Sequence, residues 1–140
     1  MQLDKVQPKN KSQLKQLINY AFKHNIYDLN FIDTSEITDM SLLFSNCMHN
    51  FDVSSWDVSN VTNMGYIFYH CKNFNCDLSN WDVSKVKNMN YMFYNCKNFN
   101  CNLSDWDISN MTRWKNIFCG CDKITIPNWY KKLYIVKNKI

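Results

Sequence analysis

The apolar residues of the central chain follow two different spacings within one stretch. A helical spacing of i, i+3, i+6, i+7 and i+10 is shown by one run: Val86, Met89, Met92, Phe93 and Cys96. Just before this run, Trp81 and Val83 flank the polar Asp82, the alternation that is typical of a half-buried strand. The pattern therefore predicts a short strand, then a short helix, then a polar return loop.

This arrangement recurs along the chain. Two aromatic columns keep an interval of 25 residues: Trp56, Trp81 and Trp106, and Phe68, Phe93 and Phe118. A fixed period of this length is typical of repeat proteins, in which each repeat buries its apolar face against the next one. We therefore expect an α/β repeat fold, a short solenoid with one parallel strand and one helix in each of about four repeats over residues 32–125.

The two ends depart from the repeat and are predicted to be helical caps. Ser12 is the expected N-cap of an amphipathic helix that ends near Asn25, with an apolar stripe formed by Leu14, Leu17, Ile18, Ala21 and Phe22. A second cap is expected after Pro127, with an apolar side formed by Trp129, Leu133 and Val136. We expect a single domain over residues 1–140, with a lead-in and capping helix at 1–31 and a C-terminal cap at 126–140.

A longer motif carries a resemblance to a known family. From Leu78 to Asn100 the chain reads Leu-Ser-x-Trp-Asp-Val-Ser-x-Val-x-x-Met-x-x-Met-Phe-x-x-Cys-x-x-Phe-Asn. This string resembles the BspA-like leucine-rich-repeat surface proteins of bacteria, a lipoprotein-type repeat domain of unknown function, over about residues 32–125. The resemblance implies a right-handed leucine-rich-repeat-type solenoid that serves in adhesion or protein binding. It also implies a host or cell-surface partner and an extracellular location.

Composition and residue spacing argue against nucleic-acid binding, a membrane span and enzymatic activity. The net charge of +4 comes from lysines gathered at the two ends, without the dense basic stripe of a nucleic-acid-binding protein. No apolar run is long enough to span a membrane. We expect no leader peptide, which by sequence alone predicts a reducing cytoplasm and free thiols. We expect no enzymatic activity, because His24, His49 and His70 fall at unrelated positions of the repeat.

Cysteines and aspartates form columns that have an alternative interpretation as metal sites. Cysteines occupy two columns of the repeat: Cys47, Cys71, Cys96 and Cys121, and Cys76 with Cys101. Zinc or redox chemistry is one interpretation, but paired CxxC motifs are absent and cysteine commonly packs as a small apolar residue. Aspartates form a further column: Asp33, Asp57, Asp82 and Asp107. Calcium binding is one interpretation of this column, and hydrogen bonding within turns is the other. We expect no cofactor and no metal.

Two groups of residues are candidates for protein binding. The first comprises Tyr66, Tyr69, Tyr91 and Tyr94, which recur on the predicted outer face of neighbouring helices. The second comprises polar rows beside the predicted strands: Asp57, Asp82 and Asp107, and Ser55, Asn80 and Asp105. Tyrosine is enriched at protein interfaces, although these rings could instead shield the stack of repeats. We expect a non-enzymatic module that binds an unidentified protein; the alternatives are a self-associating structural unit and, third, a metal- or thiol-dependent protein.

Overall fold

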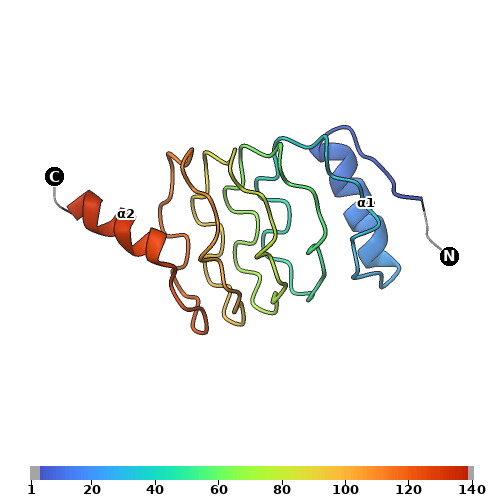
Figure 1. Cartoon of the computed structure of the whole chain (residues 1–140). Helices are drawn as coiled ribbons and strands as arrows, with labels where there is room; N and C mark the ends of the chain where they lie inside the picture. The colour runs from blue at the N-terminus through green and yellow to red at the C-terminus, as the bar shows by residue number, and fades with distance from the viewer. Residues whose placement is uncertain (1–3, 139–140) are drawn as a thin grey trace.

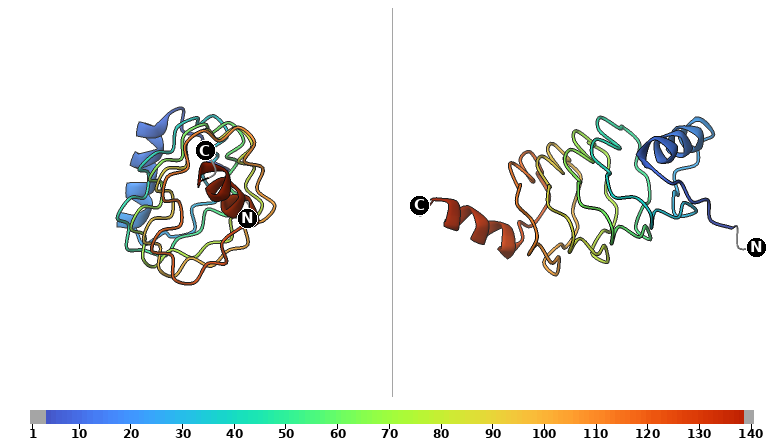
Figure 2. Two further views of the ribbon diagram at one scale, coloured as in Figure 1. Left: turned by 90° about the vertical axis from the view of Figure 1, so that its left-hand side faces the viewer. Right: turned by 90° about the horizontal axis from the view of Figure 1, so that it is seen from above.

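The computed structural model describes residues 4–138, which form a pile of coils with a helix at each end (Figure 1). The helices are α1, Lys11–Lys23, and α2, Asn128–Asn138. The coils between them begin at Ile32, Trp56, Trp81 and Trp106 and are called the first to the last coil. Viewed along the pile, they superpose as closed loops (Figure 2).

The predicted α/β leucine-rich-repeat solenoid is wrong. Within residues 4–138 the only helices are the two at the ends, and no β-strand forms. The coils are joined by isolated parallel bridges at equivalent positions, which include Asp39 with Asn63, Asn63 with Asn88, and Asn88 with Arg113. The 25-residue period of the sequence is therefore the spacing of stacked coils, but each coil consists of turns.

The segment predicted as a helix in each coil is a series of tight turns. We call this segment the turn run; its copies are residues 39–47, 63–71, 88–96 and 113–121. A helix cannot pass through it, because the backbone is left-handed at Tyr91 (φ 56°) and again at Asn95 (φ 58°). Instead of bonding along one helix, the amide of Met92 bonds the carbonyl of Met89 within the coil, while the amide of Phe93 bonds that of Ile117 in the next coil.

The segment predicted as a strand is also irregular. Trp81 and Val83 are buried and Asp82 is exposed, so the alternation is present. However, the Trp81 amide bonds the carbonyl of Leu78, and the Val86 amide bonds that of Val83, which makes a turn on each side. The Asp82 carboxylate accepts the Ser84 amide at 3.1 Å and tightens the second turn. The three residues are thus too short and too closely flanked by turns to pair as a strand.

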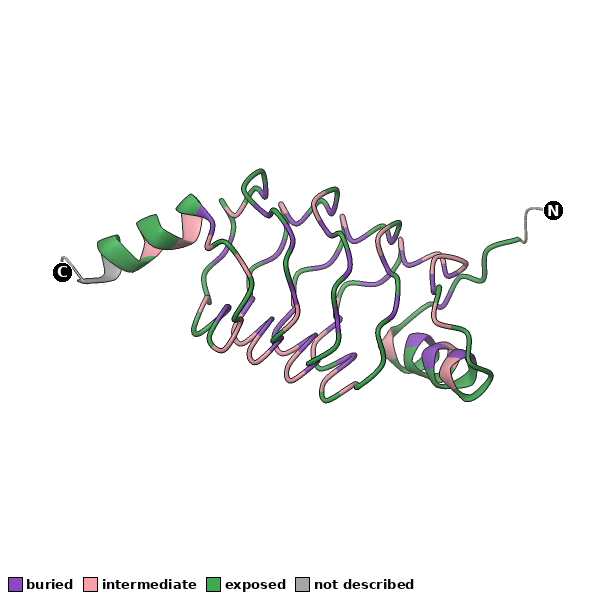
Figure 3. Ribbon diagram, turned by 90° about the horizontal axis from the view of Figure 1, so that it is seen from below, coloured by how far each residue is buried: buried purple, intermediate pink, exposed green. Residues whose placement is uncertain are grey.

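Every coil has buried positions along its backbone (Figure 3), and aromatic columns fill the inside of the pile. One column runs through all four coils, with ring centroids 5.5 to 5.8 Å apart: Phe44, Phe68, Phe93 and Phe118. Phe51, Phe74 and Phe99 form a second column beside it. Since a single coil buries its rings only against its neighbours, the coils are stable together rather than singly.

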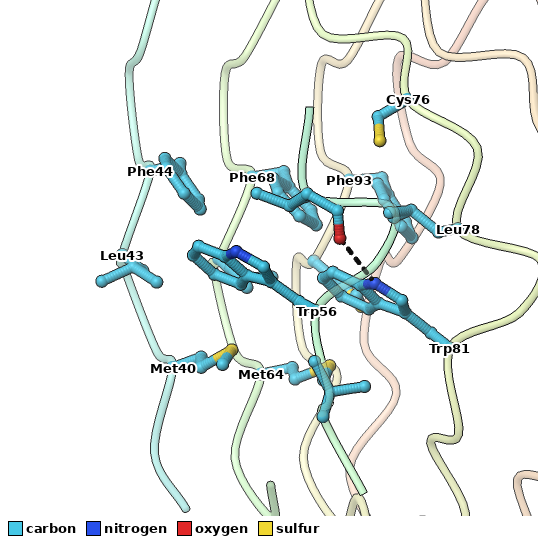
Figure 4. Packing of buried hydrophobic residues seen from close by; sticks show 14 of the residues in the cluster. Met40, Leu43, Phe44, Trp56, Met64, Phe68, Cys76, Leu78, Trp81 and Phe93 are labelled. Carbon is cyan, nitrogen blue, oxygen red and sulfur yellow. Dashed lines mark hydrogen bonds between the residues drawn. The ribbon is translucent and has the colours of Figure 1, made fainter. Parts of the chain in front are cut away.

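The tryptophan column links the coils by hydrogen bonds as well as by packing. Trp81 is only 4% exposed, and its indole Nε1 donates to the carbonyl of Val53, which lies 28 residues earlier in the chain, at 3.0 Å (Figure 4). Trp56 and Trp106 repeat this bond to the carbonyls of Leu29 and Leu78. Each indole therefore satisfies its polar atom inside the core, which is the condition for burying tryptophan at low cost.

The N-terminal helix lies across the first coil. Its N-cap is Asn10, whose side chain accepts the Gln13 amide at 2.9 Å, and not Ser12 as the sequence suggested. On the inner face of this helix, Leu14, Ile18 and Ala21 are fully buried. Before the helix, Val6 forms a parallel bridge with Ile32, so the lead-in segment continues the pile by a short additional rung.

The C-terminal helix is attached mainly by its first turn. Trp129 stacks on Trp106 at 6.5 Å, and its Nε1 donates to the Leu103 carbonyl, so it occupies the next place in the tryptophan column. Beyond this point α2 projects away from the last coil (Figure 1). Val136, predicted on the apolar side of the cap, is 61% exposed, because no coil lies beneath that part of the helix.

Candidate protein-binding surface

Tyr66, Tyr69, Tyr91 and Tyr94 come together on neighbouring turn runs, and we call them the tyrosine cluster. Tyr66 and Tyr91 stack with centroids 4.9 Å apart, and Tyr69 and Tyr94 with centroids 5.3 Å apart. Within each coil, the ring centroids of Tyr66 and Tyr69 are 5.3 Å apart and those of Tyr91 and Tyr94 are 5.5 Å apart, so the four rings form one packed group. The turn runs thus bring together side chains that were expected on the outer face of helices.

The backbone at two of these tyrosines is unusual. Tyr66 and Tyr91 have φ values of 60° and 56°, in the left-handed region that bulky residues seldom adopt. The equivalent residue in the last coil is Asn116, which tolerates this conformation better. The tyrosines therefore occupy positions at which asparagine would be less strained.

The tyrosine cluster is half-buried and has polar groups around it. His70 packs against Tyr69 at 4.2 Å, and the Asn95 side chain lies 3.4 Å from the His70 ring nitrogen Nε2. The ammonium of Lys115, which the sequence analysis did not single out, lies 5.9 Å from the centre of the Tyr91 ring. None of the four tyrosine hydroxyls bonds another group among residues 4–138. They are free to bond water or a partner.

Leu42 was also missed by the sequence analysis. It occupies the first-coil position equivalent to Tyr66, with the same left-handed backbone, and is 57% exposed. It is an apolar neighbour of the tyrosine cluster along the column. Aligning the coils at their 24-residue offset would have revealed it, because Phe44 then falls on Phe68.

Asp57, Asp82 and Asp107 are exposed but already accept hydrogen bonds within their own turns. Each carboxylate receives the amide of the serine two residues later, at 3.0 or 3.1 Å. Bonds from Ser84 and Ser109 lower the pKa of Asp82 and of Asp107 below the ordinary value. These carboxylates therefore stabilise turns, and they retain one oxygen toward solvent.

The Ser55, Asn80 and Asp105 row lies at the turn before each tryptophan. All three residues are exposed. The Ser55 amide is held by the Asn30 side chain at 2.9 Å, whereas the side chains of Asn80 and Asp105 bond no other group among residues 4–138. This row is open to solvent, but it lacks the packed aromatic area of the tyrosine cluster.

The cysteine columns serve the core. The thiols of Cys71 and Cys96 donate to the carbonyls of Phe44 and Phe68, both at 2.9 Å. Burial raises the pKa of Cys71 to about 12 and raises the pKa of Cys96 as well, which keeps both thiols protonated and unreactive. Within the described residues, no group of three or more histidine, cysteine or acidic side chains is arranged to hold a metal.

Comparison with known proteins identifies the family. The family model described as a Mycoplasma protein of unknown function, DUF285, matches residues 12–129. This chain belongs to the DUF285 family. No curated protein and no solved structure matches it.

The family assignment corrects the resemblance that the motif suggested. The match is to DUF285 and not to a BspA-like or other leucine-rich-repeat family, so the leucine-rich-repeat assignment is wrong. The motif misled because its Leu, Trp, Val, Met and Phe positions describe an apolar pattern, and that pattern here fills turns rather than strands and helices. In the described part of the chain, neither α1 nor α2 is suited by length and hydropathy to span a membrane.

Proposed function

We propose that this chain is a non-enzymatic protein-binding module and that the tyrosine cluster is its contact surface. The observation that carries the proposal is the conformation of Tyr66 and Tyr91. These two tyrosines, like Leu42 in the first coil, occupy a left-handed position at which Asn116 stands in the last coil. Such strain costs about 1–2 kcal/mol at each residue. Strained residues that persist in a stable scaffold are a reasonable starting point for a functional hypothesis.

The packing of the tyrosine cluster also supports binding. Binding a partner costs side-chain entropy, about 0.5–1.5 kcal/mol for each side chain that becomes ordered. Rings that already stack at 4.9 and 5.3 Å have lost much of this freedom before a partner arrives. Tyrosine offers apolar area with a polar tip, the combination found at many binding hot spots.

Replacing the strained tyrosines by asparagine tests the proposal. The variant Tyr66→Asn with Tyr91→Asn relieves backbone strain while it removes ring stacking worth about 0.5–1.5 kcal/mol, so stability should change little. In quantitative pull-downs from a cell extract, proteins captured by the wild-type chain should be lost with this variant. Denaturation followed by tryptophan fluorescence confirms that the variant is folded.

A matched control uses the exposed polar row. Asn80→Ala with Asp105→Ala removes two exposed side chains that bond no other group among residues 4–138. We expect capture of the same proteins to persist with this variant. If instead the tyrosine variant captures as well as the wild type, or if only the polar-row variant fails, the tyrosine cluster is not the binding surface.

Self-association is the second candidate, and exposed apolar residues on α2 favour it. Tyr134, Ile135 and Val136 are 62%, 53% and 61% exposed. Large exposed apolar side chains grouped on one element are a common feature of interfaces. Light scattering over a dilution series separates the two functions: a constant monomer mass supports the binding module, and a mass that rises with concentration supports self-association.

A further inference from the structure

The backbone-to-backbone hydrogen bonds that link neighbouring turn runs all run in one direction. Amides of alternate residues in one coil donate to carbonyls of the next: Met64 to Asn88 at 2.9 Å, Tyr66 to Asn90 at 2.9 Å, Phe68 to Met92 at 3.1 Å and His70 to Tyr94 at 2.8 Å. The third coil repeats this pattern from Met89, Tyr91, Phe93 and Asn95. The four donors of each of these coils therefore face the C-terminal end of the pile, and the carbonyls that accept from them face the N-terminal end.

The last coil has the same four donors, and the part of the chain that the structure describes supplies no acceptor for them. The equivalent amides belong to Trp114, Asn116, Phe118 and Gly120, and we call them the donor edge. Among residues 4–138 no acceptor bonds any of these four amides. Since the earlier coils use all four, the donor edge is a preformed row of hydrogen-bond donors.

At the opposite end of the pile, two carbonyls of the equivalent edge have partners. On the first coil, the carbonyls of Ser41 and Leu43 occupy the equivalent acceptor positions. Lys11 Nζ donates to the Ser41 carbonyl at 3.1 Å, and Lys15 Nζ donates to the Leu43 carbonyl at 2.7 Å. Helix α1 thus supplies cations to the acceptor edge. Helix α2 contacts the last turn run in its first turn, where Tyr130 packs edge-on against Phe118 at 5.2 Å, and then projects away from the coil (Figure 2).

The chemistry of the donor edge selects its partner. The neighbouring coils show that carbonyls of alternate residues fit these donors. Aligned amides favour negative charge, and left-handed residues such as Asn116 and Gly120 occur in backbone turns that bind anions. Arg113, at the start of the last turn run, and Lys115 are exposed and add positive charge.

We propose that the donor edge binds the backbone of an extended, acidic segment of a partner protein. The segment adds one further rung to the pile: its alternate carbonyls accept the four amides, and its carboxylates lie near Arg113 and Lys115. This inference rests on the proposed function, protein binding, but it uses backbone atoms that the tyrosine cluster does not include.

The test is an amide titration of the whole chain labelled with 15N. The probe is an N-acetylated decapeptide that alternates glutamate and threonine, and its control alternates lysine and threonine. With the glutamate peptide, we expect the largest shifts and slowed hydrogen exchange at the amides of Trp114, Asn116, Phe118 and Gly120. The lysine peptide should bind at least about tenfold more weakly, because its charges oppose those of the edge.

Two variants separate this inference from the tyrosine proposal. Arg113→Glu should weaken the glutamate peptide about tenfold, whereas Tyr66→Asn with Tyr91→Asn should leave its affinity within about twofold. Equal binding of both peptides, shifts centred on other residues, or no shifts at millimolar peptide would overturn the inference. The result of the tyrosine pull-down would be independent of this test, because the pull-down reports on the tyrosine rings and the titration reports on the backbone amides of the donor edge.

Discussion

The first coil and the last coil end the pile in different ways. Helix α1 covers the apolar face of the first coil with Leu14, Ile18 and Ala21, and its lysines bond the carbonyl edge. Helix α2 covers part of the last core with Trp129 but leaves the amide edge without a partner among residues 4–138. The comparison shows that covering the apolar core and supplying partners for the hydrogen bonds between coils are independent of each other. Both helices cover the core, but among residues 4–138 only α1 supplies such partners.

The largest expected effect concerns how firmly each helix is held. Ile18 is fully buried, so Ile18→Ala should lower the free energy of unfolding by about 2–5 kcal/mol. Leu133 is only partly buried against the core, so Leu133→Ala on α2 should cost less than about 1.5 kcal/mol. Urea denaturation of both variants measures the difference. Equal losses would mean that α2 is as much a part of the cooperative unit as α1.

The second prediction concerns the lysines on the carbonyl edge. Lys11→Met with Lys15→Met keeps the apolar stems but removes the bonds to the Ser41 and Leu43 carbonyls, together with the Lys11 bonds to Asp39 and to the Ser41 hydroxyl. It should cost about 1–3 kcal/mol in total. The control is Lys131→Met with Lys132→Met on α2. Both residues are exposed, and this variant should change stability by about 0.5 kcal/mol or less. Chemical denaturation at one pH and salt concentration compares the two pairs.

If both double variants lose the same stability, the bonds from α1 to the carbonyls contribute no more than general surface charge. The asymmetry of the two ends would then lie in the core alone. A larger loss for the α1 pair identifies these lysines as a cap on the ladder.

The period of the fold could be predicted from the sequence, but the conformation of each coil could not. Columns such as Phe68, Phe93 and Phe118 must stack if each coil buries the next, so their interval gives the number of residues in each coil. The run from Val86 to Cys96 has helical spacing, but tight turns place the same residues inward. Whether these residues form a helix or a series of turns depends on hydrogen bonds between coils. The apolar spacing within one coil carries no information about those bonds.

One local signal argued against the helix. Asn88, Asn90 and Asn95 all fall within the predicted helix, and asparagine is a poor helix former that favours turns. In the structure, the Asn88 side chain accepts the Asn90 amide at 2.9 Å, and Asn95 adopts a left-handed conformation. Giving these residues more weight than the apolar spacing would have predicted turns.

The sequence predicted which residues form the tyrosine cluster, but not their backbone conformation. The period places Tyr66 over Tyr91 and Tyr69 over Tyr94, and that arrangement needs no knowledge of the backbone. The left-handed conformation of Tyr66 and Tyr91 could not be predicted, because bulky residues seldom adopt it. The donor edge could not be predicted for the same reason as the turns, because it follows from the direction of the hydrogen bonds between coils.

The smallest expected effect is a gain in stability at the last coil. Within the pile, the Asn88 side chain donates to Asn63 Oδ1 at 3.1 Å, in a column that continues to Arg113. Arg113→Asn would extend this side-chain ladder by one hydrogen bond to Asn88. We expect the free energy of unfolding to rise by about 0.5–1.5 kcal/mol, the usual net contribution of such a bond. Arg113→Ala is the matched control, because it removes the same charge without supplying a donor. Thermal or urea denaturation should place the asparagine variant above the alanine variant, and if the two coincide, the last coil is too weakly ordered at this position to benefit from the ladder that holds the others.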